Sequence, residues 1–299
     1  MKKAVLAIVL IIISLIACLK GYDWIKENFK DARVPQYENK ESIPPSQADT
    51  KENDIPVVKI IPLDILGNSD KLSQSQWSAM QNWRKSVKQT ASENTGSLYL
   101  NGTFKKPQVS LTFDDGPDEE FTARVLDVLK QYQVPGTFFF KGNQLDRYAP
   151  IVKRAYNEGN LIESHAYSHQ ELDKMIPQDI EKEIAASDKA FERVIGVQPA
   201  MIRPPFGAIN NDVIAVCNNN GEKIILWSID TLDWAQPEPN HIAQNVLENV
   251  RPGDIILMHS CKDQESTVQA LPLIIKGLKQ KGYEMVDLSV LLNIPAYKN

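Results

Sequence analysis

From Lys106 onward, apolar runs rich in β-branched and aromatic residues alternate with segments whose apolar residues recur at helical spacing. VSLTF precedes EEFTARVLDVLKQY, and the same order recurs as far as a last apolar run around Tyr283–Val286. Near-continuous apolar strands are typical of parallel sheets that helices cover on their faces. About seven such strand-helix units suit a closed or nearly closed barrel, so the pattern predicts an α/β protein with a (β/α) barrel.

Residues 1–18 have the pattern of an export signal. Two lysines precede the apolar run Ala4–Leu19, which is shorter than a membrane span of about 20 residues and fits a secretory signal peptide. Its end, LIAC, resembles a bacterial lipobox and predicts cleavage before a lipidated Cys18. An uncleaved N-terminal anchor and a signal peptide cut elsewhere are the alternatives. All three place the rest of the protein outside the cytoplasmic membrane; the lipid or the anchor would attach it to the membrane, facing the cell wall.

Three further regions follow this leader. Residues 19–56 are polar and rich in Pro, Ser, Asn and Glu, which predicts a flexible stalk. Residues 57–97 form a short accessory segment, in which Asp70–Glu93 has the spacing of a helix whose aromatic residues pack on the main domain. Residues 98–299 form that main domain, and Asn101-Gly102 between apolar flanks predicts a β-hairpin at its start.

The amino-acid composition argues against one class of binding partner, nucleic acid. A formal net charge of -5 leaves no basic footprint, so we expect no nucleic acid partner. Once Cys18 is assigned to the leader, Cys217 and Cys261 remain, and neither has the Cys-x-x-Cys spacing of a zinc or redox site. A disulfide between them is open in an oxidising compartment, but two separate buried thiols are the expectation.

Ionisable side chains follow five of the predicted strands. In chain order they are Asp114 and Asp115, His165 with His169 four residues on, Arg203, Asp233, and His259. Because the carboxyl ends of barrel strands meet on one face, where such barrels place their chemistry, we expect these groups to converge. Asp230 is expected to cap its strand, and His241, in a predicted helix, to lie on the surface.

The histidine pair and a carboxylate suggest a metal site. The i, i+4 spacing of His165 and His169 puts two imidazoles on one helix face, or lets a tight loop bring them together. Two histidines and one carboxylate make a metal triad that leaves positions open for water and substrate. The alternative is a helix surface or a satisfied polar network. No Glu follows His165 directly, unlike in the HExxH proteases, so a catalytic base has to come from elsewhere.

Five short motifs occur in order between Lys106 and Leu292: TFDDGP, HAYSH, RPPFG, DTLDW and LMH. With these motifs the chain resembles the NodB-type polysaccharide deacetylases of carbohydrate esterase family four. The resemblance implies the distorted, incomplete (β/α) barrel of a NodB homology domain. It also implies an enzyme that hydrolyses acetyl groups from an acetylated polysaccharide, with a divalent metal as cofactor. Zinc is the first expectation, and cobalt, nickel or iron would suit the same ligands.

The family's roles carry over to the matching positions. The resemblance implies Asp114 as the catalytic base, Arg203 as the residue that orients it, and His259 as the catalytic acid, oriented by Asp233. The metal ligands that it implies are Asp115, His165 and His169, and the substrate-binding residues are Pro205, Phe206, Trp234 and Leu257. The two adjacent aspartates would therefore have different roles: the metal keeps its ligand Asp115 anionic, and Asp114 accepts a proton.

Phe206 departs from the family, which usually has Tyr at this position. A backbone N–H acting as oxyanion donor would be unaffected by this change, whereas a hydroxyl that contacts substrate would be lost and specificity would shift. The motifs do not name the sugar. The predicted location favours peptidoglycan N-acetylglucosamine; N-acetylmuramic acid, chitin-like oligomers, an exopolysaccharide and O-acetylated glycans such as xylan stay open. A catalytically silent glycan-binding protein and a hydrolase of small amides are the competing functions.

Overall fold

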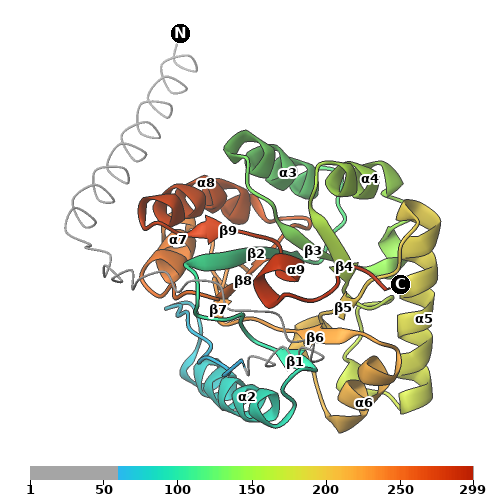
Figure 1. Ribbon diagram of the computed structural model, residues 1–299. Helices are drawn as coiled ribbons and strands as arrows, with labels where there is room; N and C mark the ends of the chain where they lie inside the picture. The colour runs from blue at the N-terminus through green and yellow to red at the C-terminus, as the bar shows by residue number, and fades with distance from the viewer. Residues whose placement is uncertain (1–59, 299) are drawn as a thin grey trace, which may run out of the picture. The chain divides into compact units, whose positions relative to one another are not determined.

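The computed structural model describes residues 60–298, which form one compact unit. The predicted leader, lipobox and stalk lie outside the described residues. Short strands and longer helices alternate along the chain, and the helices surround the strands (Figure 1). No described helix has both the length and the apolar character that a membrane crossing requires.

The strands are short and largely buried. They are β1 (Leu98–Tyr99), β2 (Gln108–Asp114), β3 (Thr137–Phe140), β4 (Leu161–Ser164), β5 (Met201–Ile202), β6 (Lys223–Ile225), β7 (Ile229–Asp230), β8 (Ile255–His259) and β9 (Glu284–Met285). The helices are α2 (Gln74–Glu93), α3 (Phe121–Tyr132), α4 (Ala149–Asn157), α5 (Pro177–Ile195), α6 (Asn211–Asn219), α7 (Pro239–Leu247), α8 (Glu265–Gln280) and α9 (Leu288–Leu292), with 3-10 turns η1 (Gly142–Gln144), η2 (Leu172–Lys174) and η3 (Pro205–Gly207).

The sheet is parallel throughout its named strand pairs. Its order is β1-β6-β5-β4-β3-β2-β8-β7, and β9 pairs with the start of β2. Strands β2, β3 and β4 carry buried residues at almost every position, which explains why the sequence shows apolar runs rather than alternation. The prediction of a distorted, incomplete (β/α) barrel is confirmed.

The apolar run KIILWSI, residues 223–229, does not form one strand but is divided in two. Its first part, β6, pairs with β5 and β1, and its second part, β7, pairs with β8. Leu226–Ser228 lie between the two strands and change partner: Leu226 donates to the carbonyl of Tyr99 at 2.9 Å, whereas Ser228 donates to Ile255 at 3.0 Å and accepts the N–H of Leu66 at 2.9 Å. One apolar run thus supplies β6 near one edge of the sheet and β7 at the other edge, which brings the two edges of the sheet close together.

The predicted β-hairpin at Asn101-Gly102 is wrong. β1 pairs in parallel with β6, and Asn101 itself is fully buried. The Asn101 side chain accepts the N–H of Leu63 at 2.8 Å and donates to the carbonyl of Ile61 at 3.2 Å. The amide therefore ties the segment before α2 to the barrel instead of forming a turn.

Helix α2 begins later than the predicted Asp70. Ser73 is the N-cap, and its side chain and Gln76 form a capping box, which satisfies the free N–H groups of the first turn. Just upstream, Leu66 forms a parallel bridge to Ile229, so this segment lies against β7. The accessory segment is thus built into the barrel wall, and α2 is held beside β1 and β6 (Figure 1).

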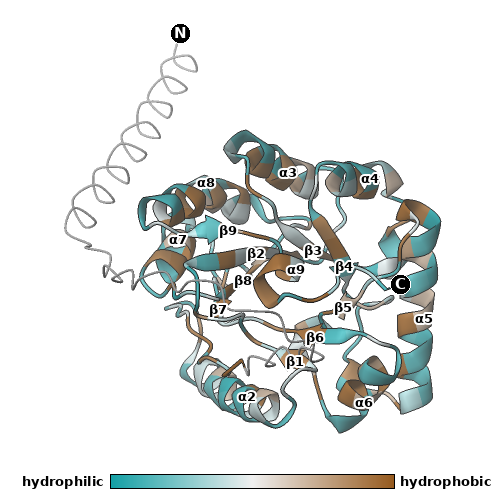
Figure 2. Cartoon of the chain, in the orientation of Figure 1, coloured by the Kyte–Doolittle hydropathy of each residue, from teal (hydrophilic) through white to brown (hydrophobic). Residues whose placement is uncertain are grey.

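Hydrophobic residues gather on the inner faces of the elements. Figure 2 shows most surrounding helices with polar residues on their outer sides, whereas α9 is hydrophobic over most of its length and lies across one end of the barrel. Phe113 and Phe138 stack with ring centroids 5.0 Å apart, joining β2 to β3. Cys217 and Cys261 form no disulfide; Cys217 is buried, as expected, whereas Cys261 is only partly buried.

Candidate active site

The strand ends bring the predicted site residues together. Asp114 at the end of β2 lies in register with His259 at the end of β8. His165 follows β4 directly, and its N–H donates to the carbonyl of Phe140 at the end of β3. Convergence at the carboxyl ends therefore follows from parallel pairing alone.

Strained backbone is concentrated at this face. Non-glycine residues with positive φ include five in or beside the motifs: Asp115, Ala166, His169, Phe206 and Leu232. Each such conformation costs about 1–2 kcal/mol and persists only where the surroundings impose it. The surrounding structure therefore holds these loops in backbone conformations that are unfavourable in themselves but orient particular side chains.

Asp115, His165 and His169 form a candidate metal site. One potential ligand atom from each lies within 4.8 Å of the others. Asp115 Oδ1 is 2.7 Å from His169 Nε2 and 3.6 Å from His165 Nε2, yet this buried oxygen forms no hydrogen bond. Converging lone pairs with no proton between them fit a shared cation, and the donor set suits a divalent transition metal.

The two imidazoles are oriented by the chain around them. His165 Nδ1 lies 2.7 Å from the carbonyl oxygen of Arg203, so this nitrogen carries the proton and Nε2 presents its lone pair. His169 lies in a loop, not on a helix. Glu183 on α5 accepts the N–H groups of Tyr167 and Ser168 at 3.1 Å and 2.7 Å, and the Ser168 hydroxyl at 2.7 Å.

Glu183 was missed by the sequence interpretation. It lies in a helix outside the five motifs, among other acidic residues of the same helix, so its sequence position gives no signal. Only the fold shows that this carboxylate faces the loop that carries His169.

Asp114 and Arg203 form a buried ion pair. Arg203 Nη1 donates to Asp114 Oδ1 at 2.7 Å and to Thr112 Oγ1 at 2.9 Å. Its other nitrogens donate to the carbonyls of Ile225 and Leu226, and its guanidinium lies 4.1 Å from the ring centroid of Phe139. A fully buried arginine with every arm engaged holds the carboxylate in one orientation.

His259 and Asp233 form the second charged pair. His259 Nδ1 lies 2.7 Å from Asp233 Oδ1, and the backbone N–H of His259 donates to Oδ2 at 2.8 Å. The Thr267 hydroxyl also donates to Oδ2, at 2.6 Å. Burial alone would lower the pKa of His259, but Asp233, Asp114 and Asp115 raise it to about 10. The imidazole is therefore protonated at neutral pH, with Nε2 free to give its proton away.

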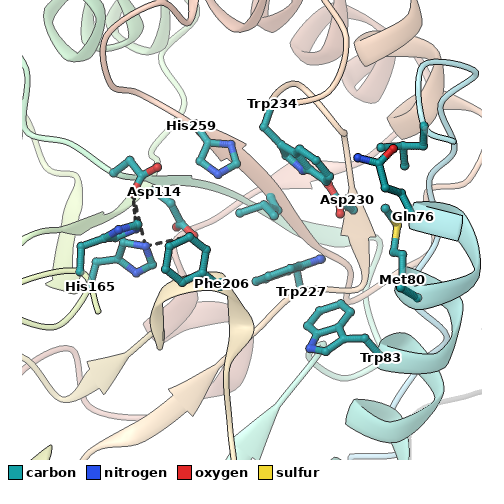
Figure 3. A pocket seen from close by; sticks show the side chains of 15 residues that line it. Gln76, Met80, Trp83, Asp114, His165, Phe206, Trp227, Asp230, Trp234 and His259 are labelled. Carbon is teal, nitrogen blue, oxygen red and sulfur yellow. Dashed lines mark ion pairs between the residues drawn. The ribbon is translucent and has the colours of Figure 1, made fainter. Parts of the chain in front are cut away.

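A cavity of about 610 Å³ opens onto these groups. Of the predicted substrate-binding residues, Phe206, Trp234 and Leu257 line it, and Pro205 does not. Phe206 and Trp234 are 64% and 49% exposed, so both rings lie at the rim. The Phe206 ring also packs edge-to-face against His169, with ring centroids 4.8 Å apart. Figure 3 shows Asp114, His165 and His259 at one end of the cavity and residues of α2 at the other.

The remaining two predictions concern Asp230 and His241. Asp230 accepts the N–H of Leu232 at 2.9 Å, as expected of a cap, but it is also buried and lines the cavity. His241 is half-buried on α7, with Nε2 3.2 Å from the side-chain oxygen of Asn68, and is not among the cavity residues.

Comparison with known proteins places this site in a family. A family model for polysaccharide deacetylases matches residues 101–225. A peptidoglycan-N-acetylglucosamine deacetylase from Bacillus cereus is 40% identical over 191 residues, which cover 63% of this chain and 70% of that protein. The crystal structure of the Bc1960 peptidoglycan N-acetylglucosamine deacetylase matches with 37% identity and a TM-score of 0.66, covering 67% of this chain and 95% of that one. BA3943 from Bacillus anthracis, a pseudoenzyme of carbohydrate esterase family four, matches with 26% identity and a TM-score of 0.62, covering 67% and 70%.

A parallel (β/α) barrel with carboxylates and imidazoles gathered at its carboxyl end is the architecture of a barrel enzyme. Within that class, the chain belongs to the polysaccharide deacetylases of carbohydrate esterase family four. It is a hydrolase that removes acetyl groups from a polysaccharide.

Proposed function

We propose that this protein deacetylates peptidoglycan N-acetylglucosamine, with a divalent cation held by Asp115, His165 and His169. The observation that carries the proposal is the convergence of Asp114, His259 and the candidate metal site in one cavity. The relatives named for peptidoglycan support this substrate. Zinc is the first choice of cation, and cobalt, nickel or iron suits the same ligands.

The cation, when bound, supplies Lewis-acid activation of the acetyl carbonyl and of the attacking water. Asp114 takes a proton from that water, and its hydrogen bond from Arg203 fixes its orientation. His259 gives its proton to the departing nitrogen, and Asp233 stabilises the imidazolium until then. One water is consumed, and acetate and an amine are the products.

The rim residues have narrower roles in this proposal. The backbone N–H of Phe206 stabilises the developing oxyanion, a role that does not require the hydroxyl of the family's usual tyrosine. Trp234 and Leu257 wall the acetyl group. Outside the cytoplasmic membrane, attached by a lipid on Cys18 or by an N-terminal anchor, the enzyme would face its polymer directly.

The test is acetate release from purified peptidoglycan by the full chain loaded with Zn(II). Asp114→Asn keeps the shape of the side chain and removes the base, so we expect the rate to fall by about 10²–10⁴-fold. Asp212→Asn, an exposed position on α6, is the matched control and should retain full activity.

Other results would point to the competing functions. Release from chitooligosaccharide alone would keep the chemistry and replace the substrate. Release only from small amides would indicate a small-amide hydrolase. A folded, metal-loaded protein that binds peptidoglycan but releases no acetate would be a silent relative, a state for which BA3943 is a precedent.

A further inference from the structure

Helix α2 contributes a buried positive charge beside the active-site cavity. Arg84 is 6% exposed, and its Nη1 donates to the carbonyl oxygen of Gly67 at 2.9 Å. Its Nε and Nη2 are also buried, and among the described residues they form no hydrogen bond. Because taking a guanidinium out of water costs several kcal/mol, a negative charge nearby is needed to offset that cost.

Asp230 supplies this negative charge. Its Oδ2 lies 4.0 Å from Arg84 Nη2, and no other carboxylate of the described residues lies within that distance of the Arg84 nitrogens. Asp230 is 3% exposed and lines the cavity at the end of β7. Each residue therefore compensates the charge of the other, in a place where either charge alone would be strongly unfavourable.

The docking of α2 fixes the distance between the two charges. Beside Arg84, the Trp83 ring packs so closely on Gly207 of RPPFG that a Cβ there would lie 2.6 Å from the ring. The segment before the helix is equally close to the strand end, since a Cβ on Gly67 would lie 2.0 Å from the carbonyl oxygen of Asp230. Gly67 thus contacts both members of the ion pair, through its carbonyl and through its Cα.

The Asp230 carboxylate also shapes the turn that leads to two site residues. Its Oδ1 accepts the N–H of Leu232 at 2.9 Å, and Leu232 has a φ of +57°. Such a conformation costs free energy in leucine and persists only where the surroundings impose it. The next residues are Asp233, 2.7 Å from His259 Nδ1, and Trp234, which lines the cavity with Asp230 (Figure 3).

We propose that Arg84 is a positioning residue for the deacetylation: through its ion pair with Asp230, it holds the turn at Leu232 and so the positions of Asp233 and Trp234. The inference rests on the proposed function, in which His259 is the acid and Asp233 orients it. No motif marks Arg84, which lies outside the residues 101–225 that the family model matches.

The ion pair gives this role a signature in the pH dependence of the reaction. Burial raises the pKa of Asp230; Arg84 from α2 and His259 from β8 lower it, and Asp233 from the same loop raises it. Without Arg84, Asp230 takes up its proton at a higher pH. A neutral carboxyl is a weaker acceptor for the N–H of Leu232, so activity should be lost first on the acidic side.

The experiment measures kcat/KM for acetate release from peptidoglycan against pH, with the Zn(II)-loaded full chain. Arg84→Met removes the charge but keeps a long side chain, and Arg84→Lys restores the charge. Asp230→Asn keeps an oxygen that can accept from Leu232 but cannot ionise, and it is made alone and together with Arg84→Met. Lys85→Met, at the next and exposed position of α2, is the matched control. Melting temperatures show whether each variant is folded.

We expect Arg84→Met to lower kcat/KM at neutral pH by about 5–50-fold, since displacements of up to 1 Å at a reacting group cost up to about 100-fold. Its acid limb should lie about 1–2 pH units higher than in the wild type. Arg84→Lys should recover most of the activity, and Lys85→Met should match the wild type. In the Asp230→Asn background, Arg84→Met should cause no further shift of the limb.

A loss in Arg84→Met that is the same at every pH would show that Arg84 only packs the helix, and would overturn the proposal. The same conclusion would follow if Arg84→Met moved the limb equally in the Asp230→Asn background. If Arg84→Met alone does not fold, the double variant decides, because it leaves no unpaired buried charge. Wild-type kcat/KM in the folded double variant would overturn the proposal, and the value of Asp230→Asn would support it. A wild type that releases no acetate would instead contradict the proposed function, and this role for Arg84 would fall with it.

Discussion

His259 shows how single contacts set the chemistry of one residue. Asp233 accepts from both the ring and the backbone N–H of His259, so position and charge are fixed by the same carboxylate. Because Thr267 also donates to Asp233, the carboxylate cannot turn away without losing a buried hydrogen bond. A proton donor is thereby kept charged in a site that would otherwise favour the neutral imidazole.

This arrangement predicts the alkaline limit of activity. In the proposed mechanism His259 must be protonated to act as the acid. Asp233 and the other carboxylates raise its pKa against the effect of burial, so activity is retained at neutral pH and lost as pH rises through the raised pKa. Asp233→Asn removes the nearest negative charge and should move the alkaline limb of the pH–rate profile about 1–3 pH units lower. The measurement is kcat against pH for both proteins. A limb that does not move would rule out Asp233 as the source of the raised pKa.

The same pair contributes to folding stability in a defined pH window. Because the folded pKa of His259, about 10, exceeds the unfolded value of about 6.5, the stabilisation is complete below the lower value and is lost as pH rises through the higher one. In metal-free protein, we expect the free energy of unfolding of the wild type to decline over this window more steeply than that of His259→Gln. Denaturant titrations at several pH values measure it, and equal slopes for the two proteins would contradict it.

Glu183 is a positioning residue for the candidate metal site. Glu183→Gln leaves the helix intact but weakens three hydrogen bonds to the loop that carries His169, so zinc affinity should fall about 10–100-fold. Competition with a chelating dye measures this affinity without reference to activity. Glu181→Gln, exposed on the same helix, is the control and should bind as the wild type does. Unchanged affinity in Glu183→Gln would show that the loop holds its shape unaided.

At the scale of elements, the contact between α2 and RPPFG links stability to the cavity. Gly207 has a φ of +65° and Trp83 against it, whereas Gly196 at the end of α5 has a φ of +77° and open space around it. Gly196→Ala should cost about 1 kcal/mol from backbone strain alone, and Gly207→Ala a further 1–3 kcal/mol from overpacking. Thermal and denaturant unfolding compare the two variants directly. Equal costs would mean that α2 moves aside freely.

The elements also show what the sequence could and could not predict. Apolar runs ending in Asp114-Asp115, His165 and His259 were sufficient for a barrel with chemistry at its carboxyl end, because parallel pairing dictates that convergence. The burial of Asn101 and the break of KIILWSI at Leu226–Ser228 depend on partners far along the chain, Ile61 to Leu66, which no local pattern identifies. Gln76, Ala79 and Met80 carry no motif either, and become cavity residues only through the docking of α2.

At the scale of the molecule, different parts of the barrel orient the ionisable side chains and shape the cavity. Buried pairs such as Arg203 with Asp114 fix the orientation of side chains at the strand ends. The exposed rings of Phe206 and Trp234, together with residues of α2, line the cavity that opens to solvent. In the proposed mechanism, catalysis and substrate choice are served by different parts of the chain, so changes in the cavity-lining residues of α2 should alter KM more than kcat.

The central claim is that acetate release requires a cation held by Asp115, His165 and His169. The most direct measurement is acetate release from peptidoglycan by the full chain after chelation, and again after stoichiometric Zn(II) is added back, with circular dichroism recorded throughout. We predict that activity disappears on chelation and returns with zinc in the wild type, that Asp115→Ala stays inactive with zinc, and that the fold is unchanged. Full activity in the metal-free protein, or in Asp115→Ala, would contradict the claim.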